Sequence, residues 1–303
     1  MSKVLVMLSI FNGEKYLNKQ LESIYEQKTE HTVKLLVRDD GSTDSSLDII
    51  NGWRNKLDIE IIYDGKNLGP ARSFMELFSH AEDADYYAFV DQDDKWDECK
   101  IQNATRMIGN TNEKVLWFSN CRLIDSNDRI IDNTLHKKKP ELNMISQLIC
   151  GSAQGCAMVF NKPLFNFINN LNNINYFMHD QLVMEYALAC GKVIYDETSY
   201  FSYRVHSNNV IAKDGKTFYS KIKSTLQIWF GKKYRFKISS FAQELLDNVG
   251  YLMDEHVKEY FEQLSNCRNS IISRLYIIRS NLTRSSVVKA TRSFKIKVIL
   301  GII

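Results

Sequence analysis

An apolar segment that ends in three carboxylates constrains this chain more than any other stretch. Residues 86–90 are aromatic or aliphatic throughout, and Asp91, Asp93 and Asp94 follow directly. Such a run is typical of a strand buried on both faces, and in open α/β sheets ligands gather beyond the carboxyl ends of such strands. Clustered carboxylates suit Mg²⁺ or Mn²⁺, since Mg²⁺ usually binds one or two of them together with phosphate oxygens. An acidic solvated turn is the alternative.

The segments before this one repeat the order strand, short loop, helix. Strands are predicted at residues 4–9, 31–37 and 59–63, and an amphipathic helix follows each. Asp39 and Asp40 form a second acidic cluster after the strand at 31–37, although Asp-Gly is also ordinary turn chemistry. The alternation predicts an α/β fold, with a mostly parallel sheet and helices on both faces. Right-handed crossovers then place the acidic loops along one edge.

The second half of the chain continues the alternation. Further strands are predicted at residues 115–119, 193–195 and 200–204, and the small residues that open the segment 151–161 predict a turn that enters a strand. From Lys213 onward the strand patterns fade and basic, helix-like segments follow.

Two polar residues of this half stand at the ends of predicted elements. Asp180 lies near the start of a helix that continues to Cys190, where an N-cap is the alternative to a functional role. His206 follows the strand predicted at 200–204. A single histidine is more often structural than a ligand, but a strand end beside other polar residues favours a functional role.

Composition is that of a soluble globular protein, with 44% hydrophobic and 25% charged residues. The 303 residues allow a sizeable core. The six cysteines show no zinc-like spacing and are interpreted as reduced structural thiols. No segment resembles a signal peptide or reaches transmembrane length, so the cytoplasm is the expected compartment.

Charge divides the chain into two parts. Residues 213–303 hold 17 Lys and Arg against 7 Asp and Glu, a balance of +10, whereas residues 1–212 hold 22 against 29, a balance of −7. We therefore expect a catalytic domain at residues 1–212 and a helical basic region at residues 213–303.

Six motifs in order resemble the inverting glycosyltransferases of family 2, which have the GT-A fold, and within them the bacterial rhamnosyltransferase-like branch. The resemblance covers about residues 3–210. It rests on residues 4–16, 37–44, 91–94 (a DxD-like motif), 155–160, 179–180 and 203–209.

The resemblance implies a metal site that binds Mg²⁺ or Mn²⁺. Asp93 corresponds to the metal ligand of the family, and Asp91 to a contact with the donor's ribose or with the metal shell. His206 corresponds to a ligand of the metal or the diphosphate. Bound metal would stabilise the departing diphosphate.

The resemblance also implies a donor pocket. Asp40 would accept a hydrogen bond from a pyrimidine base, and Ser9 and Phe11 would line the same pocket. Asn67 would lie on the donor side, with Arg72 as a partner of the diphosphate.

Asp180 corresponds to the general base that takes a proton from the acceptor hydroxyl. Where the rhamnosyltransferase-like branch commonly has aromatic residues after this position, the chain has Gln181 and Leu182, which leaves the sugar and the acceptor open. The implied reaction is metal-dependent, inverting transfer from dTDP-rhamnose or a UDP-sugar to a hydroxyl of a growing, lipid-linked cell-surface polysaccharide such as capsule or O-antigen.

Basic and apolar residues alternate along residues 268–303. We interpret this segment as an interfacial surface that brings the enzyme to the inner face of the plasma membrane. A helical appendage packed on the domain or on a second subunit is the alternative.

Three other functions compete with transfer. A non-catalytic carbohydrate-binding or scaffolding protein would have no need of both a base and a metal site. A sugar nucleotidyltransferase should show a glycine-rich phosphate loop after the first strand, which residues 9–13 lack. Nucleic-acid binding is suggested only by the basic C-terminal region, and steep salt dependence would reveal it.

Overall fold

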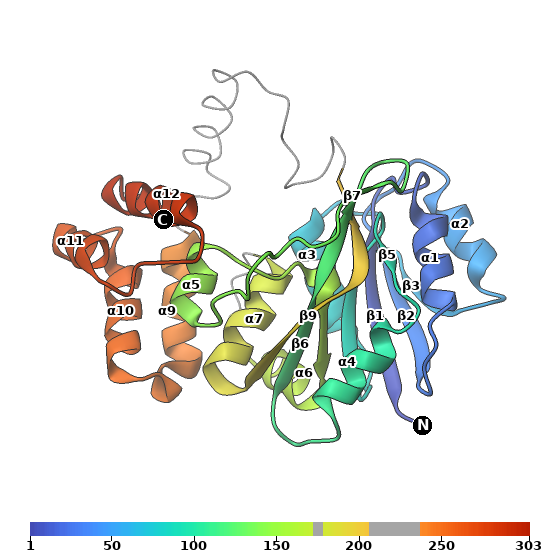
Figure 1. Ribbon diagram of the computed structural model, residues 1–303, viewed down its shortest axis with the longest axis horizontal. Coiled ribbons are helices and arrows are strands. Elements are labelled where there is room, and N and C mark those ends of the chain that lie inside the picture. Colours follow the sequence, from blue (N-terminus) through green and yellow to red (C-terminus); the bar gives the residue numbers. More distant parts are fainter. Residues whose placement is uncertain (172–177, 206–236) are drawn as a thin grey trace, which may run out of the picture.

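A computed structural model describes residues 1–171, 178–205 and 237–303 (Figure 1). In the described residues, nine strands form one sheet in the order β3-β2-β1-β4-β8-β6-β9-β5, and β7 pairs with β6 beside this path. The strands are β1 (Lys3–Ile10), β2 (Thr32–Asp39), β3 (Asp58–Ile62), β4 (Tyr86–Asp91), β5 (Lys95–Trp96), β6 (Val115–Ile124), β7 (Ile130–Asp132), β8 (Met158–Asn161) and β9 (Lys192–Arg204).

Most strands run in one direction, as predicted. The neighbours β3, β2, β1 and β4 are parallel, and β6 is parallel to β9. β8 is antiparallel to both β4 and β6, so β6 and β9 point the same way as β4. The result is a mixed sheet whose parallel strands share one carboxyl edge.

One predicted pair of strands is wrong, because residues 193–195 and 200–204 belong to the single strand β9. The polar residues between them do not end the strand. Asp196 pairs with Ser119 and Ser199 pairs with Asn120, so Glu197 and the residue after it form a bulge. A bulge accommodates extra residues on one strand while pairing continues on both sides.

Helices lie on both sides of the sheet (Figure 1). On one side α1 and α2 pack together, while α3 and α6 both contact α7 on the other. The aromatic core joins this second group to the sheet, as the ring centroids of Tyr87 in β4 and Phe165 in α6 lie 3.9 Å apart. The helices of this part are α1 (Leu17–Tyr25), α2 (Ser46–Trp53), α3 (Pro70–Ser79), α4 (Lys100–Ile108), α5 (Met144–Ile149), α6 (Lys162–Asn169) and α7 (His179–Cys190), with the 3-10 turn η1 (Gly155–Ala157) before β8.

The C-terminal residues form a helical region at the end of the molecule opposite α2 (Figure 1). It consists of α9 (Lys237–Val249), η2 (Gly250–Leu252), α10 (Glu255–Asn266), α11 (Ile271–Arg279) and α12 (Val288–Ile299). α9 packs on α7, and α12 contacts α5. Tyr186 of α7 donates its hydroxyl to Glu244 of α9 at 3.1 Å. The predicted helical character is confirmed, while the predicted boundary between residues 212 and 213 lies outside the described residues. No helix in the described part of the chain has the length and apolar character to cross a bilayer.

Candidate active site

The carboxyl ends of β1, β2 and β4 bring the predicted donor and metal residues to one edge. Ser9 of β1 pairs with Arg38 on one side and with Asp91 on the other. The two acidic loops that follow β2 and β4 therefore flank the end of β1, as the crossover rule predicts.

A buried hydrogen-bond network occupies the donor side of this edge. Arg38 is fully buried, and its Nη1 donates to Asp40 Oδ1 at 2.5 Å and to Ser73 Oγ at 2.9 Å. Ser9 Oγ lies 2.6 Å from Ser73 Oγ. The predicted residues Ser9 and Asp40 are thus joined through Ser73, which no sequence motif had marked, and through Arg38, which lies in the motif at residues 37–44 but was given no role.

Asp40 also shapes the loop before α3. Its Oδ1 accepts the Leu68 N–H at 2.7 Å and its Oδ2 accepts the Gly69 N–H at 2.9 Å. This loop presents Asn67, and α3 presents Arg72, with both side chains exposed. A carboxylate has about four acceptor positions, so Asp40 can hold this loop and still accept one bond from a ligand.

Phe11 is tied to the loop after β4 through its backbone. Its N–H donates to Gln92 Oε1 at 2.8 Å, and Gln92 Nε2 donates to the Phe11 carbonyl at 3.0 Å. The Phe11 ring is 46% exposed. A side chain at Gly13 would collide with Gln92, because an added Cβ would lie 2.4 Å from its Oε1. Gln92 therefore sets the distance between the two loops.

Arg204, the last residue of β9, holds the Asp93-Asp94 loop. Its backbone N–H donates to Asp94 Oδ1 at 3.0 Å and its Nε donates to the Asp93 carbonyl at 2.7 Å. Its Nη1 bonds Asp128, and its guanidinium lies 4.4 Å from the Tyr16 ring centroid. Arg204 is fully buried. His206, predicted as a ligand, lies two residues further on, outside the described residues.

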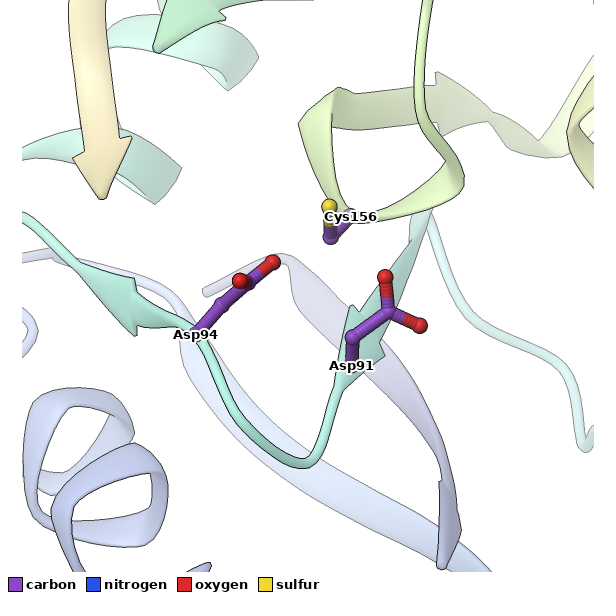
Figure 2. A group of neighbouring side chains, drawn as sticks. All are labelled: Asp91, Asp94 and Cys156. Carbon is purple, nitrogen blue, oxygen red and sulfur yellow. The ribbon is translucent and has the colours of Figure 1, made fainter. Parts of the chain in front are cut away.

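Asp91, Asp94 and Cys156 form a cluster in which one potential ligand atom of each lies within 4.8 Å of the others. Figure 2 shows them between the loop after β4 and the η1 turn. Burial raises the pKa of Asp91 to about 7, and the charges of Asp93 and Asp180 contribute. Burial likewise raises the pKa of the Cys156 thiol, so Cys156 keeps its proton beside these carboxylates.

The oxygen atoms of this edge fit a hard divalent cation, and the sulfur does not. Mutual repulsion among the carboxylates contributes to the raised pKa of Asp91, and a bound cation relieves such repulsion. Mg²⁺ and Mn²⁺ prefer oxygen ligands. Asp91 and Asp94 both belong to the cluster, whereas Asp93, the predicted ligand, does not, although its charge acts on Asp91. The protonated thiol of Cys156 instead serves the neighbouring carboxylates.

Asp180 lies in the first turn of α7 and does not cap it. The N-cap residue is Met178, which has no capping side chain. The Asp180 carboxylate accepts the Gln181 N–H at 2.7 Å, and the Gly155 N–H lies nearby. Burial raises the pKa of Asp180 to about 6, although these N–H groups oppose the shift. A carboxylate with this pKa is ionised at neutral pH and can accept a proton.

His179 fixes the start of α7 from the apolar side. Its ring is buried and stacks on Phe74, with centroids 3.9 Å apart, and it meets the edge of Phe89 at 4.6 Å. Burial lowers the pKa of His179 to about 3, so the ring is neutral. His179 is therefore a packed residue that orients its neighbour Asp180.

A pocket of about 210 Å³ opens beside Asp180. Its described lining comes from α5, the loop before η1 and α7, and no lysine or arginine is among these lining residues. They are Gln147, Gly151, Ser152, Ala153, Gln154, Met178, Asp180, Gln181 and Met184.

Comparisons with known proteins show the family of the chain. The sequence pattern described as Glycosyl transferase family 2 matches residues 5–166, more than half of the chain. dTDP-rhamnosyl transferase RfbG of Shigella flexneri is 29% identical over 259 residues, which are 80% of this chain and 85% of RfbG. Poly(ribitol-phosphate) beta-N-acetylglucosaminyltransferase TarS of Staphylococcus aureus is 30% identical over 154 residues, which are 49% of this chain and 26% of TarS.

Solved structures share the fold. The crystal structure of S. aureus TarS 1-349 in complex with UDP-GlcNAc superposes with a TM-score of 0.62 at 19% identity, over 92% of this chain and 76% of that chain. The mannosyltransferase PcManGT from Pyrobaculum calidifontis, in complex with GDP-Man and Mn²⁺, gives a TM-score of 0.53 at 12% identity, over 99% and 85%. The predicted GT-A architecture is confirmed, and the family match over more than half of the chain shows that this protein is a glycosyltransferase that belongs to glycosyl transferase family 2.

Proposed function

We propose that the enzyme moves a sugar from a pyrimidine nucleotide-diphospho-sugar to an acceptor hydroxyl, with inversion at the sugar carbon and a divalent cation at the carboxylate edge. One observation carries this proposal: the Asp180 carboxylate lines the pocket beside α7, and its negative charge contributes to the raised pKa of Asp91 at the end of β4. A direct displacement needs such a base close to the leaving group's binding site but on the opposite face of the sugar.

Asp180 acts as the general base. The acceptor hydroxyl enters through the pocket, and Asp180 takes its proton as the oxygen bonds to the sugar carbon. The bond between that carbon and the diphosphate oxygen breaks in the same step. The Gly155 and Gln181 N–H groups favour the ionised carboxylate, which keeps the base ready at neutral pH.

The sheet edge binds the donor. Asp40 and the exposed ring of Phe11 receive the pyrimidine base, and Asp91 receives the ribose. Ser9 supports Asp40 through Ser73 and Arg38. Asn67 and Arg72, both exposed beside this network, receive the diphosphate. When Mg²⁺ or Mn²⁺ is bound at Asp93 and Asp91, it offsets the negative charge of the departing diphosphate. His206 is proposed as a further ligand from its sequence position alone.

The relatives suggest the donor. RfbG is named a dTDP-rhamnosyl transferase and matches most of this chain, which supports dTDP-rhamnose. TarS, crystallised with UDP-GlcNAc, supports a UDP-sugar as the second candidate. Thymine and uracil, the bases of these two donors, both present an imide N–H from which Asp40 would accept a hydrogen bond.

The acceptor is proposed to be a lipid-linked saccharide at the inner face of the plasma membrane. On α12, Val288, Arg292, Ile296 and Ile299 recur at helical spacing and are all exposed, and they combine apolar and basic character. α12 lies at the top of Figure 1, the side toward which β6 runs. Each basic residue near an anionic surface contributes about 1 kcal/mol. We place the domain boundary near residue 212, so that the C-terminal region forms this surface.

A panel of UDP-, dTDP- and GDP-sugars, each with Mg²⁺ or Mn²⁺, tests the reaction through slow donor hydrolysis. Hydrolysis of dTDP-rhamnose or a UDP-sugar, well above the rate of the Asp180→Asn variant, is the expected result. If UDP and dTDP bind but no donor is consumed, the protein is a binding module. Release of pyrophosphate from dTTP or UTP and a sugar phosphate would instead identify a nucleotidyltransferase.

A further inference from the structure

The η1 turn, Gly155–Ala157, touches both halves of the proposed site. We infer that Gly155 and Cys156 are positioning residues that set the placement of the base Asp180 relative to the carboxylates of the donor side. This inference rests on the proposed function, and consecutive residues of one turn carry it.

Gly155 contacts the base and leaves no room for a side chain. Its N–H lies near the Asp180 carboxylate and favours the ionised form. A Cβ at this position would lie 2.3 Å from His179 Nε2 and 3.0 Å from its Cδ2. His179 cannot easily withdraw, because its ring is buried against Phe74 and Phe89. Only glycine therefore allows the turn to approach the start of α7 this closely.

Cys156 contacts the other half of the site. Its Sγ lies within 4.8 Å of a carboxylate oxygen of Asp91 and of Asp94, and the three side chains cluster in Figure 2. Asp94 is in turn held by the Arg204 N–H. Cys156 is 0% exposed, so its thiol serves these neighbours and does not meet substrate.

Lys100 of α4 fixes the position of the η1 turn. Its Nζ donates to the Cys156 carbonyl at 2.8 Å, and the side chain is 0% exposed. The ammonium lies 4.8 Å from the ring centroids of both Trp96 and Phe201. A buried cation held by aromatic faces and a carbonyl is a fixed point, so the turn has little freedom to shift.

These contacts make the turn a spacer of defined length. Gly155 fixes where the acceptor hydroxyl loses its proton, and Cys156 fixes the carboxylates on the donor side. A misplacement of about 1 Å can reduce a rate by about 100-fold even when the altered residue does not touch substrate. Changes in the turn should therefore reduce turnover more than they reduce nucleotide binding.

Three variants test the inference: Gly155→Ala, Cys156→Ala and Cys156→Ser. The measurements are kcat with the donor that the nucleotide-sugar panel selects, Mn²⁺-dependent binding of UDP and dTDP by calorimetry, and melting temperature. We expect Gly155→Ala to lower kcat by about 100-fold while the nucleotide Kd changes by less than about threefold. Cys156→Ala should weaken Mn²⁺-dependent nucleotide binding, and Cys156→Ser, which keeps a donor, should restore most of it.

Cys267→Ala is the matched control, since Cys267 is also fully buried but lies at the end of α10, in the C-terminal region. It should leave kcat and nucleotide binding unchanged. Equal values for Cys156→Ala and Cys156→Ser in all three measurements would overturn the role of the thiol. A lower melting temperature with wild-type kcat in Gly155→Ala would make the turn merely structural. The calorimetric comparison of the Cys156 variants needs no turnover, so it remains decisive even if the wild-type protein consumes no donor.

Discussion

The carboxyl edge of the sheet buries charged side chains, whereas the C-terminal helices expose apolar ones. Arg38, Lys100 and Arg204 are each 0% exposed, while Ile271 and Ile272 are 71% and 79% exposed. Both regions depart from the usual partition of residues between surface and core. Comparing them shows which departures the chain compensates by itself.

At the sheet edge the compensation is internal. Arg38 bonds Asp40, Lys100 bonds the Cys156 carbonyl, and Arg204 bonds the loop after β4. Buried charges are costly unless paired and hydrogen-bonded, and here the partners hold the proposed catalytic loops. On α11 and α12, by contrast, exposed isoleucines stand among basic residues, and nothing in the described part of the chain covers them. We expect the first region to serve chemistry and propose that the second serves association.

Loss of the proposed metal ligand from the carboxylate edge should have the largest effect on activity. Asp93→Ala should abolish detectable transfer, because the charge of the departing diphosphate is then left without its counterion. The fold should persist, since Asp93 is a half-buried loop residue. Activity is measured with and without EDTA, and calorimetry follows Mn²⁺-dependent binding of UDP and dTDP. Full wild-type activity in EDTA would refute a metal role for this edge.

Removing the base should have the next largest effect. Asp180→Asn is nearly isosteric and should lower kcat by at least about 100-fold, since losing a general base typically costs about 100- to 10,000-fold. Nucleotide affinity and melting temperature should stay near the wild-type values. Wild-type turnover would place the base elsewhere, and unfolding of the variant would favour a structural role for Asp180.

The exposed face of the C-terminal helices is tested by charge reversal. Lys289→Glu with Arg292→Glu should remove at least about 2 kcal/mol of attraction to anionic vesicles, or a factor of about 30 in partitioning. Flotation with liposomes that contain anionic lipid measures this. The paired control is Arg106→Glu with Lys192→Glu, two exposed cations of the catalytic part.

Equal flotation of the two double variants would show that Lys289 and Arg292 do not contribute to membrane binding. If the wild-type protein and a chain ending near Glu262 both fail to float, the membrane role should be dropped. A change in oligomeric state on charge reversal, without flotation of the wild type, would support packing against a second subunit.

The pH dependence of kcat/KM should show a smaller effect, which tests the protonation of Asp180 at the sheet edge. The pKa of Asp180 is raised to about 6, and the base works only when ionised. Therefore kcat/KM should be constant above pH 7 and fall as pH decreases through about 6, losing about tenfold for each further unit. The residual rate of Asp180→Asn should lack this inflection. A wild-type profile that is flat between pH 5 and pH 8 would contradict the assignment.

Local patterns were sufficient for the first four strands with the helices between them, and for three carboxylates after the fourth strand. The apolar run at 86–90 predicted β4, and the acidic residues after it marked its end. Such patterns are local because hydrophobic periodicity reports which face of an element is buried. Residues 193–204 show the limit: the polar interruption looked like the end of a strand, but pairing with β6 carried β9 through it as a bulge.

Sequence alone determined the identity and approximate position of Asp91 and Asp180, because each stands where a predictable element begins or ends. Tertiary structure decided what surrounds them. Cys156 meets Asp91 and Asp94 across more than sixty positions of sequence, and Gly155 is required by the ring of His179. Neither relation leaves a local signal, since a buried cysteine or a glycine in a turn looks the same wherever it packs. Contacts between distant segments arise only when the sheet and α7 close around the η1 turn, and these contacts set the protonation of the carboxylates and the spacing of the site.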